Sequence, residues 1–480
     1  MSLVKDIQVA TRSLDRFVPI VGRAPVDEVH QAAALLAQRL GGRVIWNVSS
    51  TAVGGGVAEM LQSLIGYARS TGADVRWLVI EGSDEFFRIT KRLHHALHGA
   101  GGDGSGLDDA AHDVYAATLA RNAIELRGRI MPGDVVLLHD PQTAGLAPPL
   151  LAAGAHVLWR CHIGADEKNA DVTHGWQFLH PYLDNVKKMI FSRAAYVPDR
   201  YRDGRAVVIQ PSIDIFSTKN IDFDDHTIRS ILVHVGLIEG PLPPSAHLGF
   251  MRSDDTPSRV ERRADVVQLG RASCWETPLV VQVSRWDPLK DMVGVLRGFA
   301  ALVQDHPELD ADLVLAGPNV HAIADDPEGP VVFAEVMRAF CEQPQAVRAH
   351  IHLAMLPTAD VEENAAIVNA LQRHATVVVQ KSLHEGFGLT VTEAMWKSRP
   401  VVASAVGGIR DQIEDGVSGL LVPDPTDDRA FGNAVCRILK DPAFAGELGR
   451  RAHERVRRHF LALRHLVQLG NAVVDLVAPR

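Results

Sequence analysis

Features that would place a protein in a membrane, outside the cell or on nucleic acid are missing from this sequence of 480 residues. No run of about 18 or more apolar residues occurs, so we expect no transmembrane helix, and the first residues lack the apolar core of a signal peptide. The formal net charge of −9 argues against nucleic-acid binding, which normally needs a basic face. The cysteines lie far apart without a C-x-x-C pair, which favours reduced thiols of a cytoplasmic protein over a disulfide or zinc framework; they are Cys161, Cys274, Cys341 and Cys436.

Strand-like and helix-like segments alternate in two series, which predicts two α/β domains with parallel sheets. Between the series, residues 240–272 hold four prolines and lack periodicity, so we interpret them as an exposed insertion near the domain junction. Residues 443–477 look helical, with Arg and His on the exposed side. The expected strands are 43–48, 74–80, 134–140, 155–162 and 207–209 in the first series, and 279–283, 311–316, 350–353, 376–379, 400–403 and 419–423 in the second.

The most informative stretch is a strand-to-helix turn at residues 381–395, which holds two glycines and two glutamates. An expected helix from Leu389 to Lys397 follows the turn. Such turns direct backbone N–H groups and the positive end of a helix dipole at one point, which suits a phosphate. Glu385 in the turn and Glu393 in the helix could accept hydrogen bonds from hydroxyls on both sides of a diphosphate, as in a nucleotide sugar. Without a ligand, glutamates at a helix start still stabilise it by about 0.3–1 kcal/mol.

A second pair of candidates follows the expected strand 279–283. Arg285 and Lys290 could reach one point at the end of this strand, and a guanidinium with an ammonium suits a diphosphate. The alternative is that both cations form solvated ion pairs with Asp287 and Asp291.

In the first series, a triple glycine at 54–56 joins a strand to a helix, and polar residues end two further strands. The glycines favour close approach of backbone to a phosphate or sugar, although tight packing alone would also use them. His139, Asp140 and His162 fall at carboxyl ends of strands, where open α/β sheets bind ligands. A buried histidine held by a carbonyl is the competing interpretation of His162.

Taken together, these motifs resemble a known family. Arg285, Lys290 and the E-x7-E pattern from Glu385 to Glu393 are similar to those of retaining glycosyltransferases that use nucleotide sugars. Within that class the N-terminal half resembles the trehalose glycosyltransferring synthases (trehalose synthases). The resemblance covers nearly the whole chain and departs from it at 164–166 and 240–272; the matching N-terminal stretches are residues 47–61, 83–87, 138–142, 159–163 and 211–214.

The resemblance implies a GT-B fold, in which two Rossmann-like α/β domains face each other across a ligand cleft. Residues 1–215 would form the acceptor domain, and the C-terminal helix at about 456–480 would pack back on it. Residues 216–455, with the insertion at about 240–272, would form the donor domain.

The resemblance also implies transfer of glucose from ADP- or UDP-glucose to free glucose, giving α,α-trehalose in a reversible reaction. Glu393 would bind the ribose, Arg285 and Lys290 the leaving diphosphate, and Glu385 the donor hexose. The implied catalytic residues are Arg285, Lys290, Glu385 and His162. The implied donor site adds Gly55, Gly56, Gly386, Phe387, Gly388, Leu389, Thr390 and Glu393, and the implied acceptor site consists of His139, Asp140, Gln142 and Arg160.

In such families the configuration is retained by front-face attack, and the leaving phosphate takes the acceptor proton. We therefore nominate no protein nucleophile. No metal or other cofactor is required, although Mg²⁺ is compatible with the chemistry, and we expect a homodimer that binds neither nucleic acid nor membrane. Three alternatives stay open: a trehalose phosphorylase or a glucosyltransferase with another sugar acceptor, a glycosidase with two carboxylates across the scissile bond, and a non-catalytic nucleotide-sugar-binding protein.

Overall fold

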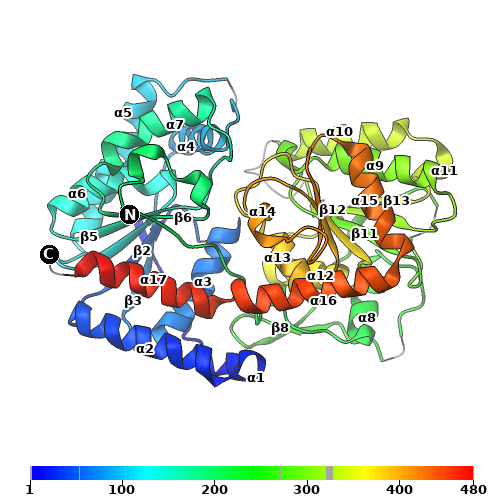
Figure 1. Ribbon diagram of the computed structural model, residues 1–480, viewed down its shortest axis with the longest axis horizontal. Coiled ribbons are helices and arrows are strands. Elements are labelled where there is room, and N and C mark those ends of the chain that lie inside the picture. Colours follow the sequence, from blue (N-terminus) through cyan, green and yellow to red (C-terminus); the bar gives the residue numbers. More distant parts are fainter. Residues whose placement is uncertain are drawn as a thin grey trace. The chain divides into compact units, whose positions relative to one another are not determined.

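The computed structural model describes residues 3–52, 55–102, 104–243, 245–270, 272–320 and 328–478. The chain divides into two compact units, Met1–Ile213 with Phe460–Arg480 (unit 1) and Asp214–His459 (unit 2). Each unit contains one seven-stranded sheet with helices on both faces (Figure 1). This confirms the predicted α/β class with two Rossmann-like folds. No helix in the described ranges is long and apolar enough to span a membrane.

The sheet of unit 1 has the strand order β1-β3-β2-β4-β5-β6-β7. Only β1 is antiparallel, and it pairs with β3 at the sheet edge, while the other strands are parallel. The strands are β1 (Val4–Ile7), β2 (Ile45–Ser49), β3 (Val75–Ile80), β4 (Val135–His139), β5 (His156–Cys161), β6 (Lys188–Phe191) and β7 (Ala206–Val208).

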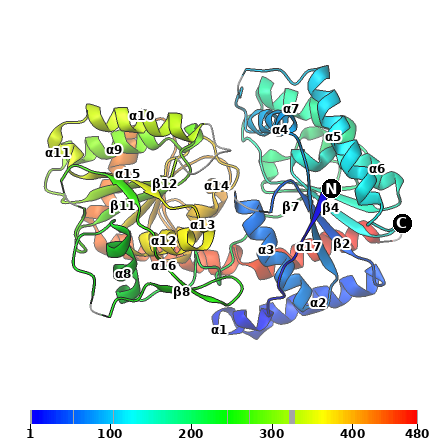
Figure 2. The same cartoon turned by 180° about the vertical axis from the view of Figure 1, so that it is seen from behind.

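The helices of unit 1 bury apolar side chains on both sheet faces. Helices α4 to α7 cover one face, with Phe86, Tyr115 and Trp159 in its core. On the other face, α2, α3 and α17 pack on the sheet, and α2 and α17 lie side by side although opposite ends of the chain supply them (Figures 1 and 2). The helices are α1 (Val18–Val21), α2 (Arg23–Leu40), α3 (Gly55–Ser70), α4 (Asp84–Leu97), α5 (Asp109–Arg127), α6 (Ala147–Ala152), α7 (Ala170–Leu183) and α17 (Ala462–Val477), with short 3-10 turns at Leu14–Phe17, Pro141–Leu146, Ala194–Tyr196 and Asp199–Tyr201.

The sheet of unit 2 has the order β10-β13-β12-β11-β14-β15-β16. Strand β10 is antiparallel at the edge, and the other six strands are parallel. The strands are β10 (Asp265–Val267), β11 (Leu279–Val283), β12 (Asp312–Pro318), β13 (Ile351–Leu356), β14 (Val377–Gln380), β15 (Val401–Ser404) and β16 (Leu420–Val422), and β8 (Gly249–Met251) pairs with β9 (Pro257–Arg259) in a separate hairpin.

Helices again cover both faces of this second sheet. Helices α9, α10 and α15 pack on one face around Leu296, Phe299 and Phe431, while α8, α12 and α13 lie on the other (Figures 1 and 2). The helices are α8 (Asp225–Val235), α9 (Met292–Asp305), α10 (Gly329–Glu342), α11 (Gln345–Arg348), α12 (Val361–His374), α13 (Leu389–Trp396), α14 (Ile409–Gln412), α15 (Asp428–Lys440) and α16 (Pro442–His459), with a 3-10 turn at Pro288–Lys290.

The structure adds elements that the sequence patterns did not predict. Strands β1 and β6 are only four residues long, too short to show an apolar alternation. Within the segment interpreted as an exposed insertion, β10 pairs with β13 and so belongs to the main sheet.

The C-terminal helical segment is two helices, not one. Phe460 and Leu461 interrupt it because the N–H of Ile213 donates to the carbonyl of Phe460 at 3.0 Å and Ile213 forms a β-bridge with Leu461. The prediction that the histidines of this segment are exposed is wrong for His465, which is fully buried.

Both sheets reverse their strand order at one point. In unit 1 the reversal lies between β2 and β4, and in unit 2 it lies between β11 and β14. Ligands of open α/β sheets bind outside the carboxyl ends of the strands at such a switch point. The loops that follow these four strands are therefore the expected ligand sites.

Candidate active site

In unit 2 the loops after β11 and β14 are bonded to each other. The N–H of Leu383 donates to the carbonyl of Leu289 at 2.8 Å. Gln282, a buried residue of β11, donates to the carbonyl of Lys290 at 2.8 Å and accepts from the N–H of Lys381 at 3.1 Å. One side chain thus sets the spacing of the two loops that the sequence singled out.

Lys290 and Glu385 form an ion pair across these loops. The Lys290 Nζ lies 2.6 Å from Glu385 Oε2, and the two side chains are only 18% and 13% exposed. Ser382 Oγ lies 3.4 Å from the same carboxylate oxygen. The alternative that Lys290 pairs with an aspartate of its own loop is therefore wrong.

For Arg285 the structure shows the solvated ion pair that was the alternative to a diphosphate site. Its guanidinium donates to Asp287 Oδ2 at 2.8 Å, and its side chain is 62% exposed. An exposed pair of this kind contributes about 0–1 kcal/mol to stability, so Arg285 can leave Asp287 at little cost.

Helix α13 begins beside the Lys290–Glu385 pair. Gly388 precedes the helix with φ of +86° and provides no side chain to cap it. The carbonyl of Gly386 accepts from the N–H of Gly408 at 3.3 Å, and the carbonyl of Phe387 accepts from the Gln412 amide. The Gly386–Gly388 turn is therefore fixed by α14, with the dipole of α13 and its first residues, Leu389 and Thr390, at the carboxyl edge of the sheet.

Glu393 is a buried residue of α13. Its carboxylate lies 3.7 Å from Lys219 Nζ, and its carbonyl accepts from Lys397 Nζ at 3.3 Å. Lys397 is also held by Asn220 and Gln372. Burial lowers the pKa of Lys397 to about 7, against the opposing field of Glu393. The ribose-binding role of Glu393 stays a prediction.

Lys381 is a buried cation of this region to which sequence reasoning assigned no role. Its side chain is fully buried, and its Nζ contacts Asp291, Asp428 at 2.8 Å and the carbonyl of Pro425 at 2.8 Å. Asp291 also caps α9 by accepting from the N–H of Gly294. The aspartate expected near Lys290 thus belongs to Lys381.

In unit 1 the switch point carries a row of buried polar side chains. His139 Nδ1 lies 3.2 Å from His162 Nε2, and His139 Nε2 lies 3.1 Å from Asn47 Oδ1. Burial, reinforced by the positive charge of Arg160, lowers the pKa of His139 to about 3 and holds that of His162 well below its ordinary value. Both imidazoles are therefore neutral at physiological pH. Sequence reasoning found the two histidines together but missed Asn47.

Asp140 adopts an unusual backbone conformation, with φ of +64° and ψ of 176°. Its carboxylate accepts from the N–H of His162 at 2.7 Å, and its own N–H donates to the carbonyl of Arg160 at 2.8 Å. Burial raises the pKa of Asp140 to about 7, although the His162 N–H and the Arg160 charge oppose that shift. Strained, over-determined residues of this kind cluster at functional sites.

Arg160 points into the fold of unit 1. Its NH1 group donates to His465 Nε2 at 2.6 Å, and its NH2 group donates to the carbonyl of Ile209 at 3.3 Å. His465 Nδ1 in turn lies 2.9 Å from Ser212 Oγ. Burial lowers the pKa of Arg160 to about 9. His465 lies 305 residues from Arg160 along the chain, so no sequence pattern signals this contact.

The remaining predicted residues of unit 1 lie at the start of α3 and in the 3-10 turn after β4. Gln142 follows β4, and its Oε1 atom is buried with no hydrogen-bond partner among the described residues. Gly55 begins α3 with φ of +79°, and nothing lies within 4 Å of the position that a Cβ would take, so tight packing does not explain this glycine. Gly56 follows it in α3, and Gly54 lies outside the described residues.

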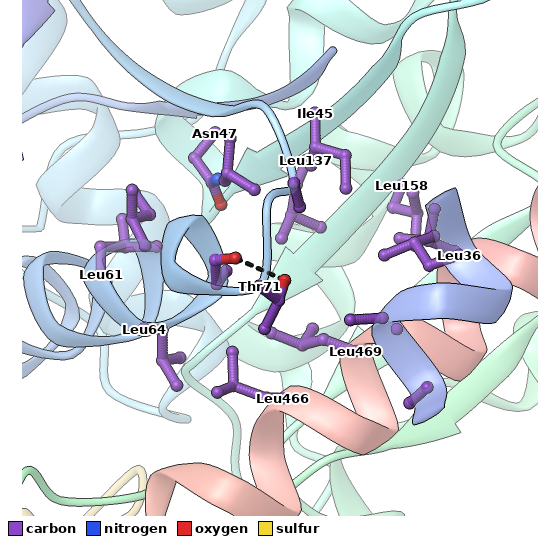
Figure 3. A pocket seen from close by; sticks show the side chains of 18 of the residues that line it. Leu36, Ile45, Asn47, Leu61, Leu64, Thr71, Leu137, Leu158, Leu466 and Leu469 are labelled. Atoms are coloured by element: carbon purple, nitrogen blue, oxygen red, sulfur yellow. Dashed lines mark hydrogen bonds between the residues drawn. The ribbon is translucent and has the colours of Figure 1, made fainter. Parts of the chain in front are cut away.

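A small cavity of about 90 Å³, with His139 in its lining, lies on the sheet face that α2, α3 and α17 cover (Figure 3). Apolar side chains line most of it, among them Leu36, Leu61, Leu137, Leu158 and Leu466 from these three helices and from β4 and β5. Asn47, His139 and Arg160 form its polar side. Thr71 also lines it, but its hydroxyl is satisfied by the Ala68 carbonyl at 2.7 Å.

Comparison with known proteins agrees with this architecture. Residues 47–198 match the family described as "Trehalose synthase, N-terminal domain", and residues 275–458 match "Glycosyl transferases group 1". The trehalose synthase of Pyrococcus horikoshii is 34% identical over 465 residues, covering 96% of each chain. That of Rubrobacter xylanophilus is 34% identical over 90% of each chain.

More distant proteins share the fold. A trehalose phosphorylase of Pleurotus pulmonarius is 28% identical over 82% of this chain and 52% of its own length. The crystal structure of a UDP-forming α,α-trehalose-phosphate synthase from Burkholderia xenovorans, in complex with glucose-6-phosphate, aligns with a TM-score of 0.67 at 17% identity. That alignment covers 91% of this chain and all of the other. The fold is thus that of GT-B glycosyltransferases, as predicted. With two relatives at 34% identity over nearly its full length, the chain belongs to the trehalose synthase family of group 1 glycosyltransferases.

Proposed function

We propose that this protein transfers glucose from a nucleoside diphosphate to free glucose and forms α,α-trehalose reversibly, with retention of configuration. The observation that carries the proposal is the Lys290–Glu385 pair, at 2.6 Å, beside the uncapped start of α13 at the switch point of unit 2. A cation, a carboxylate and a helix N-terminus at one place suit a ligand with both phosphates and hydroxyls.

The donor would contact both residues of this pair, its diphosphate at Lys290 and its hexose at Glu385. Departure of a diphosphate builds negative charge on oxygen, and fixed cations stabilise such charge most when water is excluded. Lys290 would turn from Glu385 to the phosphate, and Arg285 would leave its weak surface pair with Asp287. Glu385, released from Lys290, would accept hydrogen bonds from hexose hydroxyls, with the Gly386–Gly388 turn alongside.

The nucleoside would lie towards Glu393. A buried carboxylate next to Lys219 is an acceptor for ribose hydroxyls, as the family pattern implies. Separate reactions with ADP and UDP would identify the base as adenine or uracil.

Unit 1 would supply the sugar-binding residues. His162 is neutral, so it can take part in a hydrogen bond to the sugar without carrying charge, while both ring nitrogens of His139 are engaged by Asn47 and His162. Gln142 Oε1 is a buried acceptor with no partner in the described part of the chain, which suits a sugar hydroxyl. Gly55 and Gly56 would let the backbone approach the ligand closely. We nominate no protein nucleophile; the leaving phosphate would take the proton of the acceptor.

A trehalose phosphorylase is the second candidate, because phosphorylases are among the similar proteins. That reaction would use inorganic phosphate in place of the nucleoside diphosphate. It would have no use for a ribose-binding glutamate, so Glu393 distinguishes the two candidates.

The test is to incubate the purified protein with trehalose and, in separate reactions, ADP, UDP or inorganic phosphate. We expect nucleoside diphosphate glucose and free glucose from one nucleotide, and loss of that product in Glu393→Ala. Glu447→Ala, which removes an exposed glutamate of α16, is the matched control and should keep full activity. Glucose 1-phosphate formed from inorganic phosphate alone would replace the transferase by the phosphorylase.

Three further parts of the proposal rest on the resemblance and on composition. Transfer should proceed in EDTA, because Lys290 and Arg285 supply the positive charge that a metal ion would otherwise supply.

The protein should be a homodimer in solution, which light scattering measures. The four free thiols suit a cytoplasmic location, which fractionation of the source cells would test.

A further inference from the structure

The row of side chains from Asn47 to His162 has a direction, because each hydrogen bond needs one donor and one acceptor. Asn47 Oδ1 faces His139 Nε2 at 3.1 Å, and an amide oxygen can only accept. His139 Nε2 must therefore carry a proton. Since His139 is neutral, its Nδ1 is then unprotonated and can only accept.

The same reasoning passes to the next residue. His162 Nε2 lies 3.2 Å from His139 Nδ1 and must donate to it. A neutral His162 with its proton on Nε2 has a lone pair on Nδ1. Among the described residues, no hydrogen bond reaches this Nδ1. His162 keeps 8% of its surface exposed. His162 Nδ1 is thus an acceptor to which no described residue donates.

Neighbouring groups hold the ring of His162 in place without choosing its tautomer. The Asp140 carboxylate accepts from the backbone N–H of His162, not from its imidazole. The two imidazoles stack with an interplanar angle of 18°. Burial and the charge of Arg160 keep both rings neutral by lowering the pKa of each. Among the described residues, Asn47 is the group at the end of the row that dictates a proton position.

We propose that Asn47, acting through His139, fixes His162 as the tautomer protonated on Nε2, so that His162 Nδ1 accepts a hydrogen bond from a hydroxyl of the bound sugar. Asn47 is in this view a positioning residue that touches no substrate. The sugar contact rests on the proposed function, whereas the tautomer does not.

The tautomer can be read directly by NMR of the full-length protein labelled with ¹⁵N-histidine. An unprotonated imidazole nitrogen resonates far downfield of a protonated one, and His139→Gln and His162→Gln identify the signals. We expect an unprotonated Nδ1 and a protonated Nε2 for His162. A protonated Nδ1 on His162 would mean that the amide of Asn47 presents its nitrogen, and would overturn the proposal.

Variants at Asn47 separate positioning from packing. Asn47→Leu removes the acceptor and should mix the tautomers of His162, whereas Asn47→Asp keeps an acceptor oxygen and should preserve the wild-type tautomer. Asn122→Leu is the matched control, because Asn122 is also a buried asparagine of unit 1 but bonds to Glu81 and Thr118, away from the histidines. Its histidine signals should match those of the wild type.

The kinetic readout is kcat/KM for the sugar. Loss of a group that orients a metal-ligating histidine costs about 10–100-fold. We expect a loss of kcat/KM of about that size in Asn47→Leu and rescue of most of it in Asn47→Asp. Equal activity of Asn47→Leu and wild type would overturn the positioning role. If the wild type transfers no glucose at all, the proposed function fails, and the NMR result still decides the tautomer.

Discussion

The Lys290 ammonium lies 2.6 Å from the Glu385 carboxylate, so a diphosphate bound as proposed would have to draw it to a new partner. In the proposed function, this exchange of partners is the reason for a largely buried ion pair at the carboxyl edge of the sheet.

Replacing Lys290 by methionine removes the ammonium group and therefore tests its proposed role in transfer. We expect glucosyl transfer to fall by about 10²–10³-fold, the usual cost of removing one group that stabilises developing charge. The measurement is kcat and KM for the nucleotide sugar. Lys440→Met is the control, since Lys440 is an exposed cation of the same unit that pairs with Glu308. A variant at position 290 with normal kcat would refute a role in leaving-group departure.

A second residue-scale prediction concerns pH and His139. Its pKa is about 3 in the folded protein and ordinarily 6.5, so the unfolded state takes up a proton below pH 6.5 that the folded state refuses. Stability of unit 1 is thus present above pH 6.5 and is lost as the pH falls towards 3. At about pH 4.5 this single group costs about 2–3 kcal/mol.

His139→Gln should remove that loss. Amide hydrogen exchange of β4 and β5, corrected for intrinsic rates, should show a smaller difference between about pH 7.5 and about pH 4.5 in the variant than in the wild type. The variant is also expected to be less stable at both pH values because hydrogen bonds are lost, so the difference between pH values is the informative quantity. Equal differences in both proteins would contradict the neutral buried state of His139.

At the scale of elements, the start of α13 depends on Gly388. Its φ of +86° is rarely adopted by residues with a Cβ, and a Cβ there would lie 3.1 Å from Glu385 Cγ and 3.3 Å from Ile409 Cγ1. A substitution thus strains the backbone and also displaces Glu385.

Gly388→Ala should destabilise unit 2 by roughly 1–2 kcal/mol through the backbone and should weaken donor binding as well. Gly416→Ala isolates the first effect, because Gly416 has φ of +72° with nothing within 4 Å of the added Cβ. Calorimetry of nucleotide-sugar binding compares the two variants. If both bind the donor equally well, the position of Glu385 does not depend on Gly388.

At the scale of the whole molecule, unit 1 is completed by the last segment of the chain. Helix α17 packs beside α2, and its His465 accepts from the buried Arg160. A buried guanidinium that loses its acceptor is costly, because the charge stays desolvated without compensation.

Ending the chain at His459 should therefore unfold unit 1 while unit 2 keeps its fold. Limited proteolysis followed by mass spectrometry should recover a resistant fragment within Asp214–His459 and none from Met1–Ile213. A control chain that ends at Ala478 retains all of α17 and should resist cleavage in both units. Resistance of residues 1–213 in the shorter chain would show that unit 1 is stable without α17.

The sequence by itself determined most of the elements and predicted the chemical class of the site. Apolar periodicity and glycine-containing strand-to-helix turns depend on neighbouring residues, so most strands, the α13 turn and the order of Arg285, Lys290, Glu385 and Glu393 could be predicted from local pattern. The polar ends of β4 and β5 were visible for the same reason.

Only the tertiary structure decided which of these residues meet. Lys290 and Glu385 are 95 residues apart, and Asn47 and His139 are 92 apart. They come together because β11 lies beside β14 and β2 beside β4, a strand order that the alternation of elements does not specify. The contact of His465 with Arg160 depends further on the return of α17 to unit 1. Pairings of this kind are set by sheet order and helix packing, which bring distant residues together after the local elements have formed.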